Sequence, residues 1–112
     1  MIIYINDNAL NRIINKTKII EGRVYDKFFK KNYHKLQTNT HIIFTSRKTD
    51  KYIKCSIKRV TKYNSLNEYL NNENIENIAP MTKRELFQHY KNLYQNKNRY
   101  KLPFIAIEFN SF

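Results

Sequence analysis

The stretch that decides the fold is Lys18-Ile-Ile-Glu-Gly-Arg-Val-Tyr25, which contains the only glycine of this 112-residue chain. Successive strand side chains alternate between two faces, so Gly22 shares one face with apolar residues, whereas Glu21 and Arg23 share the other. The apolar face should pack on the core, where a glycine lets another segment approach the backbone closely. Glu21 and Arg23 then project together from the opposite face, roughly 7 Å apart at two strand steps.

The sequence on either side predicts further strands separated by helices. We expect strands at residues 2–5, 19–25, 41–46, 51–62 and 103–109, and a first helix at residues 8–16. Two later helices begin with Ser/Thr-x-x-Glu capping boxes at residues 65–68 and 82–85. This order excludes a doubly wound parallel sheet. It predicts an α+β fold, a small mixed β-barrel with flanking helices, in a single domain over residues 1–112.

Two local patterns refine this prediction. In the strand at residues 51–62, the apolar period of two slips between Ile57 and Val60, which predicts a β-bulge. In the last helix, apolar residues recur at three- and four-residue spacing, and such a stripe is typical of core packing rather than of a ligand platform. The members of this stripe are Leu86, Phe87, Tyr90, Leu93 and Tyr94.

The net charge of +12 is divided unevenly along the chain. Residues 1–62 contain 15 Lys/Arg and 4 Asp/Glu, whereas residues 63–112 contain 6 and 5. The abundance of Asn, Lys, Ile and Tyr indicates an AT-rich coding bias such as some large DNA viruses show, but this bias does not explain the excess of cations over carboxylates. A basic surface concentrated in one half favours a polyanionic partner, nucleic acid or a nucleotide. The alternative interpretation is a solvated face that keeps a small protein soluble.

Other classes of protein are disfavoured by what the sequence lacks. The single cysteine, Cys55, excludes an internal disulfide, is typical of a reducing compartment, and alternates with isoleucines as a core thiol would. No signal peptide or membrane span is predicted, so we expect a soluble intracellular protein, in the cytoplasm or nucleus, with no membrane partner. Zinc, P-loop and dinucleotide motifs are missing, so we expect no metal and no cofactor. The sequence gives no indication of the oligomeric state.

The connection at residues 27–40 alternates cations with aromatic rings. The residues concerned are Lys27, Phe28, Phe29, Lys30, Lys31, Tyr33, His34 and Lys35. Such interleaving can grip phosphate and stack bases. A loop that covers one end of a barrel would instead use the same rings to plug the core. Both interpretations stay open, and they are compatible.

The candidate ligand site consists of Lys18, Glu21 and Arg23. Arginine can donate two hydrogen bonds to a phosphate or a base edge, and glutamate can accept a hydrogen bond from an exocyclic amine. Lysine adds positive charge or acts as a base when it is desolvated. An Arg–Glu pair on an exposed strand contributes only about 0–1 kcal/mol, so stability alone gives no strong reason for the arrangement. The candidate nucleic-acid-binding residues also include one neighbour on the same strand face and two cations of the turn at residues 47–50: Tyr25, Arg47 and Lys48.

These motifs resemble an ASCH domain of the PUA-like superfamily. The resemblance covers about residues 10–109 and rests on residues 18–23, Ile42-Ile-Phe44, Val60-Thr-Lys-Tyr63, residues 65–70, Tyr90-Lys-Asn-Leu-Tyr94 and Phe104-Ile-Ala-Ile-Glu-Phe109. The chain is similar in particular to the EOLA-like branch, in which Glu-Gly-Arg recurs at this point. The resemblance implies a small β-barrel with flanking helices and an association with RNA through a cleft beside the Lys, Glu and Arg motif.

Two turns depart from the family pattern. Asn39-Thr40 stands where the family usually has Gly-Asp, and Asn15 or Lys16 stands where the motif helix often ends in Gly. Asparagine tolerates the left-handed conformation that such positions need. We interpret both departures as changes of the scaffold.

Three hypotheses for the function follow. The first is a protein that binds RNA or a modified nucleoside in a basic cleft around Lys18, Glu21 and Arg23. The second is a small nucleoside amidohydrolase or ribonuclease, in which Lys18 and Glu21 are the catalytic groups. The third is a protein-interaction module in transcription regulation. Whether the protein is an enzyme stays open at this point.

The amidohydrolase branch of the family implies a Lys, a Thr and a Glu as catalytic groups. Lys18 matches that Lys, but Glu21 stands at the position of the Thr. The remaining candidates for the catalytic Glu give no secure match: Glu73, Glu76 and Glu85. The resemblance therefore favours the amidohydrolase hypothesis less than the binding hypothesis.

Overall fold

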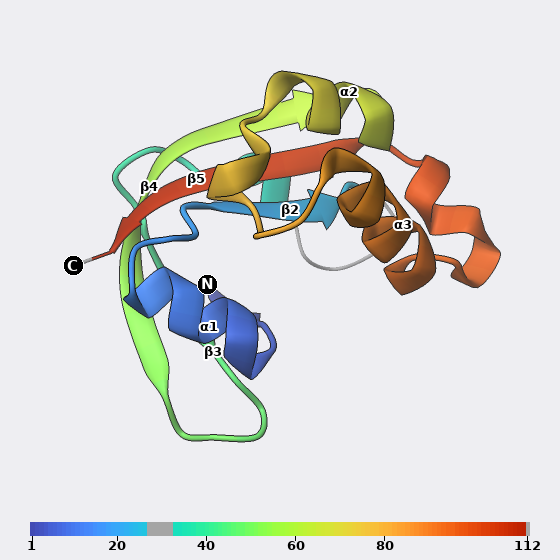
Figure 1. Ribbon diagram of the computed structural model, residues 1–112. Helices are drawn as coiled ribbons and strands as arrows, with labels where there is room; N and C mark the ends of the chain where they lie inside the picture. Colours follow the sequence, from blue (N-terminus) through green and yellow to red (C-terminus); the bar gives the residue numbers. More distant parts are fainter. Residues whose placement is uncertain (27–32, 112) are drawn as a thin grey trace.

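The central element is a five-stranded sheet with the strand order β1-β3-β4-β5-β2 (Figure 1). We describe a computed structural model over residues 1–26 and 33–111, without the side chain of residue 34. The strands are β1 (Ile2–Tyr4), β2 (Ile20–Val24), β3 (His41–Thr45), β4 (Tyr52–Tyr63) and β5 (Phe104–Ser111). β1 is parallel to β3, and the other neighbours are antiparallel, which makes the sheet mixed as predicted.

The sheet curls into a half-barrel around its two longest strands. β4 spans 12 residues and β5 spans 8. Their pairing shifts between Ile57 and Arg59, so the bulge predicted from the sequence is confirmed. A bulge bends its strand and increases the local twist, which favours this curvature. The predicted fold, a small mixed barrel with flanking helices, is confirmed in this half-barrel form.

The helices pack on both faces of the sheet. They are α1 (Asp7–Ile14), α2 (Leu66–Asn72) and α3 (Lys83–Leu93), with short 3-10 helices η1 (Tyr33–Lys35), η2 (Ile75–Asn77) and η3 (Asn96–Lys101). On one face, Leu10 and Ile13 of α1 belong to a buried cluster with β3, β4 and β5. On the other face, Tyr69 of α2 and Tyr90 of α3 pack with β2 and β5. The inner strand β5 is therefore buried on both sides.

The structure bears on two expectations from the sequence, the burial of Cys55 and the prediction that no segment spans a membrane. Cys55 is fully buried, and burial raises the pKa of its thiol to about 11, as befits a core thiol. Across residues 1–26 and 33–111, no helix combines the length and the hydrophobicity that crossing a bilayer requires.

Both predicted capping positions begin helices. At α3 the capping box is complete, because the Thr82 hydroxyl accepts from the Glu85 amide and the Glu85 carboxylate accepts from the Thr82 amide at 3.0 Å. At α2 it is half formed. The Ser65 hydroxyl accepts from the Glu68 amide at 3.0 Å, but the Glu68 carboxylate accepts from Asn64 instead.

The basic, aromatic connection at residues 27–40 is described only from residue 33 onward. Tyr33 and Leu36 pack against the cluster that contains α1, in agreement with the core-plug interpretation of that part. The expectation for Lys27, Phe28, Phe29, Lys30 and Lys31 lies outside the described residues. Asn39 has a φ of 67°, so the turn that lacks the family glycine is built with a left-handed asparagine.

Lys16 is one of the two residues that the resemblance places where the family helix often ends in glycine, and it has a φ of 64° just after α1. Left-handed backbone costs a residue with a Cβ about 1–2 kcal/mol, and helices commonly use glycine there. We expect Lys16→Gly to raise the free energy of unfolding by about 1 kcal/mol in urea denaturation. Lys16→Ala removes the same charge and keeps the Cβ, so it should give no comparable gain. Equal stabilisation by both variants would show that the charge, not the backbone, matters.

Candidate nucleic-acid interface

Lys18, just before β2, forms one ion cluster with Glu21 and Arg23 of β2. Lys18 Nζ lies 3.2 Å from Glu21 Oε1, and an Arg23 guanidinium nitrogen lies 2.9 Å from Glu21 Oε2. Lys18 is 4% exposed and Glu21 is 9% exposed, so this is not a surface ion pair. The structure therefore brings the three residues together around a central carboxylate.

All three donors of the Lys18 ammonium have acceptors. Besides Glu21, Lys18 Nζ donates to the carbonyl oxygens of Ile20 at 2.6 Å and Ile78 at 2.9 Å. Carbonyl oxygens only accept, so this geometry suits the protonated amine with its three N–H groups. Burial lowers the pKa of Lys18, and the charge of Glu21 opposes that effect. Lys18 thus acts as a fixed cation that orients Glu21 and ties β2 to the segment after η2.

Glu21 stays ionised in spite of its burial. Burial alone would raise the pKa of Glu21, but the charges of Lys18 and Arg23 outweigh it and hold the pKa below its usual value. Each carboxylate oxygen uses one of its lone pairs on these cations. A second lone pair on each oxygen can accept a hydrogen bond from a ligand.

Arg23 bridges the two edges of the sheet. β1 and β2 stand at opposite ends of the strand order, and an Arg23 guanidinium nitrogen donates to the Tyr4 carbonyl at 3.0 Å. We call this gap between β1 and β2 the seam. The Arg23 guanidinium also lies 5.7 Å from the centroid of the Tyr33 ring, within the range of a cation–π interaction. Burial acts to lower the pKa of Arg23, but Glu21 raises it above its usual value.

A pocket of about 750 Å³ opens along the seam. This volume lies within the range of about 300–1,000 Å³ that is typical of small-molecule sites. Five of the six predicted binding residues line it: Lys18, Glu21, Arg23, Arg47 and Lys48. Tyr25 does not line the pocket. Its ring packs against the cluster that contains α1 and lies 4.4 Å from Lys62 Nζ.

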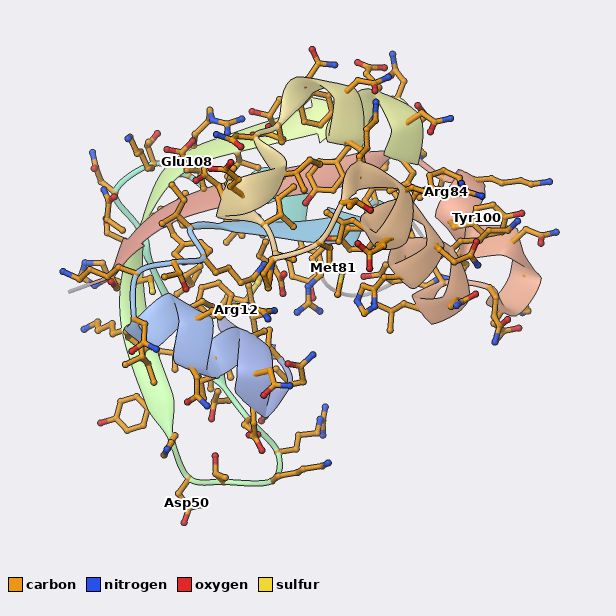
Figure 2. All side chains as sticks on the ribbon, viewed as in Figure 1. Arg12, Asp50, Met81, Arg84, Tyr100 and Glu108 are labelled. Atoms are coloured by element: carbon orange, nitrogen blue, oxygen red, sulfur yellow. The ribbon has the colours of Figure 1, made fainter. Side chains whose placement is uncertain are left out.

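The pocket has two walls of different chemistry. The basic wall comes from α1, whose last turn contains Arg12, and from the β3–β4 turn, with Arg47 and Lys48. The apolar wall comes from α3 and the segment before it, and includes Met81 and Leu93. Figure 2 labels one residue of each side, Arg12 on α1 and Met81 ahead of α3. A ligand with an apolar plane and an anionic end matches this asymmetry.

Two residues of α1 that line the pocket each contain a buried polar atom without a partner among the described residues. In the described part of the chain, Arg12 Nε and Asp7 Oδ1 are buried without a hydrogen-bond partner. Both residues line the pocket. Buried polar atoms are normally hydrogen-bonded, so these two atoms are exceptions beside the pocket.

The sequence pattern misassigned one residue of the apolar wall. Helical spacing grouped Leu93 with the core stripe of α3, but Leu93 is 60% exposed and lines the pocket. Leu86 and Tyr90 of the same stripe are buried as predicted. Helical periodicity identifies the residues that share a face, but it does not tell what lies opposite each turn. His89, also exposed on this wall, gave no signal in the sequence.

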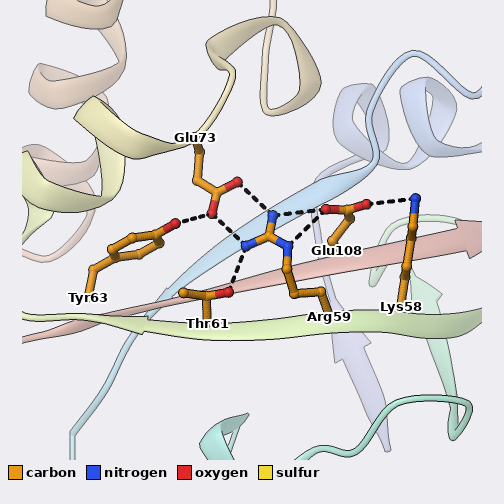
Figure 3. A network of polar contacts seen from close by, with 6 residues as sticks. All are labelled: Lys58, Arg59, Thr61, Tyr63, Glu73 and Glu108. Carbon is orange, nitrogen blue, oxygen red and sulfur yellow. Dashed lines mark hydrogen bonds and ion pairs between the residues drawn. The ribbon is translucent and has the colours of Figure 1, made fainter.

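A second polar network lies on β4 and β5 (Figure 3). Arg59 donates to the two carboxylate oxygens of Glu73, at 2.7 and 2.8 Å, and to Glu108 at 2.8 Å. The Tyr63 hydroxyl also donates to Glu73. This network fastens the end of α2 to the sheet and does not line the pocket along the seam.

The same geometry bears on the candidates for a catalytic carboxylate. None of the three glutamates considered from the sequence lines the pocket: Glu73, Glu76 and Glu85. Among the described residues, the carboxylates that do line it are Asp7 and Glu21. Over the same residues, no group of three or more His, Cys, Asp or Glu side chains is arranged to hold a metal ion.

Comparisons with known proteins agree with this architecture. The sequence profile of the ASCH domain family matches residues 3–112. A structure of a hypothetical protein is 25% identical with a TM-score of 0.77, over 99% of this chain and 97% of that chain. A protein from Pyrococcus furiosus is 25% identical with a TM-score of 0.68, over 99% and 96%.

A mutant ASCH protein from Zymomonas mobilis is 12% identical with a TM-score of 0.67, over 97% of this chain and 67% of that chain. At that identity the likeness shows the fold alone. The comparison with curated proteins gave no match.

Proposed function

This chain belongs to the ASCH domain family, and from that premise we propose that it binds RNA or a modified nucleoside in the pocket around Lys18, Glu21 and Arg23. The family as a whole is associated with RNA. The observation that carries the proposal is the pocket itself, in which a buried, ionised Glu21 stands between a basic wall and an apolar wall. Phosphate suits the first wall and a base suits the second.

Each residue of the site has a distinct role in this proposal. Arg47 and Lys48, both exposed at the pocket, contact phosphate. Glu21 accepts a hydrogen bond from the ligand, for which an exocyclic amine is the natural donor. Arg23 adds positive charge at the seam, and Lys18 holds Glu21 in place from behind.

The catalytic alternative, an amidohydrolase or ribonuclease based on Lys18 and Glu21, receives less support. A lysine that acts as a catalytic base or nucleophile needs a free lone pair on its nitrogen. Lys18 instead donates to three acceptors and is 4% exposed. The arrangement therefore supports binding by Glu21 better than proton transfer by Lys18.

We expect single-stranded RNA to bind with an affinity that falls as salt rises. Combining Arg47→Ala with Lys48→Ala should weaken binding and reduce the slope of log affinity against log salt by about 1.4, because each of the two phosphate contacts on a single strand contributes about 0.7. Fluorescence anisotropy with a labelled RNA at several salt concentrations measures both quantities.

The chain offers a matched control for this experiment. Lys83 and Arg84 are an exposed Lys–Arg pair at the start of α3, outside the pocket. Replacing both with alanine removes the same charge and should change binding little. An affinity insensitive to salt, or an equal loss in the two double variants, would contradict the proposal.

A further inference from the structure

Within residues 1–26 and 33–111, one edge of β2 has no strand beside it. β2 lies at the end of the strand order, and among these residues its ladder joins it only to β5. The Phe109 amide donates to the Ile19 carbonyl and the Tyr25 amide donates to the Pro103 carbonyl, so the odd-numbered residues of this stretch face β5. Because backbone groups alternate in direction along a strand, those of Ile20, Gly22 and Val24 point to the free edge.

Side chains cover this free edge on both sides of Gly22. The Ile20 carbonyl accepts from Lys18 Nζ at 2.6 Å. The Tyr94 side chain lies near the backbone of Val24, which acts to lower the pKa of the Tyr94 hydroxyl against the stronger effect of burial. Between them, Gly22 lines the pocket, and the hydrogen bonds found among the described residues outside the β2–β5 ladder include none to its N–H or C=O. A donor and an acceptor on one residue therefore face the pocket side by side.

The surroundings of Gly22 restrict what can occupy this position. The backbone is flanked by the buried carboxylate of Glu21, with the apolar wall of α3 on one side and the cations of the β3–β4 turn beyond. A backbone donor and acceptor pair suits a flat group that carries its own donors and acceptors along one edge. Nucleobases have such edges, and a base reaches a pocket edge-on only when it is unpaired.

We propose that the N–H and C=O of Gly22 read the edge of a single unpaired nucleobase, with the base against the α3 wall and its phosphate toward Arg47 and Lys48. This inference rests on the proposed function and assigns the orientation of the ligand within the same pocket.

Selective labelling offers a direct test, since a chain with one glycine labelled with 15N-glycine gives one backbone amide signal. We expect adenosine 5′-monophosphate and cytidine 5′-monophosphate to move the Gly22 amide proton downfield in a saturable way, as a new hydrogen bond forms. Ribose 5-phosphate carries the anion without the base and should leave the signal in place. Calorimetry on the same samples reports binding independently of this signal.

The variant with Arg47→Ala and Lys48→Ala separates the two ends of the ligand. It should weaken the binding of the nucleotides, while the shift of the Gly22 signal at saturation stays the same. Binding detected by calorimetry without movement of the Gly22 signal would overturn this inference and leave the proposed function standing. An equal shift with ribose 5-phosphate would also overturn it. The absence of any binding of nucleotides and of RNA would overturn the inference and the proposed function together.

Discussion

Replacing Gly22 with alanine is expected to lower the free energy of unfolding by about 3 kcal/mol, the upper end of what overpacking a core costs. A Cβ at this position would lie 2.7 Å from Tyr69 Cζ and 2.8 Å from the Tyr90 hydroxyl, whereas non-bonded carbon atoms prefer about 3.5–4.0 Å. Both rings are buried and pack on Phe104, with centroid distances of 5.6 and 5.4 Å. Neither ring can therefore move aside without disturbing the other.

The cause of this expected loss can be isolated with double variants. Gly22 has no positive φ, so alanine would fit the backbone and only the space is missing. Tyr69→Phe removes the nearest hydroxyl, which otherwise bonds to Tyr90. In urea denaturation, Gly22→Ala should therefore cost less in the Tyr69→Phe background than in the wild type. An alanine variant as stable as the wild type, or a cost unchanged by Tyr69→Phe, would contradict the packing argument.

Alternation along a strand was sufficient to predict which way β2 faces. The sequence placed Gly22 toward the core and Glu21 with Arg23 on the opposite face, and in the structure Tyr69 and Tyr90 occupy the space that a side chain at Gly22 would need. The bulge in β4 and the starts of α2 and α3 were also predictable. All of these depend on neighbours within a few residues, where spacing and capping chemistry act directly.

The seam could not be predicted in the same way. It exists because the sheet places β1 and β2 at its two ends and then curls, so that Arg23 meets the carbonyl of Tyr4. Likewise, Lys18 Nζ donates a hydrogen bond to the carbonyl of Ile78, 60 residues later in the chain. Nothing near Lys18 in the sequence indicates that acceptor, and without it Lys18 could still be interpreted as a catalytic base.

Strand parity alone did not predict the surroundings of Tyr25. Tyr25 follows the alternation of Glu21 and Arg23, which suggested a place beside them. In the structure it lies beyond the end of β2, and its ring packs on the core and on Lys62. A shared face does not guarantee a shared pocket once the sheet curves. Its role in ligand binding stays a prediction from the sequence.

Glu21→Ala is expected to lower the free energy of unfolding by about 3–5 kcal/mol, because it leaves the buried ammonium of Lys18 without its carboxylate. Chemical denaturation at neutral pH measures this loss. The double variant Lys18→Met with Glu21→Met removes both buried charges and should recover most of the stability, since apolar replacements of a buried pair are often neutral. Arg23 then keeps the Tyr4 carbonyl as an acceptor, and its side chain is 20% exposed. A double variant no more stable than Glu21→Ala would contradict this account.

The same ion cluster predicts how stability depends on acid. Because the pKa of Glu21 in the folded protein is held below its ordinary value of 4.5, the unfolded chain binds more protons between those two values. Stability from Glu21 is therefore fully present above about pH 4.5 and is lost as the pH falls through the lower, folded pKa. Glu21→Gln cannot titrate, so its free energy of unfolding should fall less steeply below that pH than that of the wild type.

Glu108, whose pKa is also lowered and which remains in the variant, leaves a residual acid dependence. Identical slopes for the two proteins between pH 5 and the acid transition would show that Glu21 is not held ionised by Lys18 and Arg23.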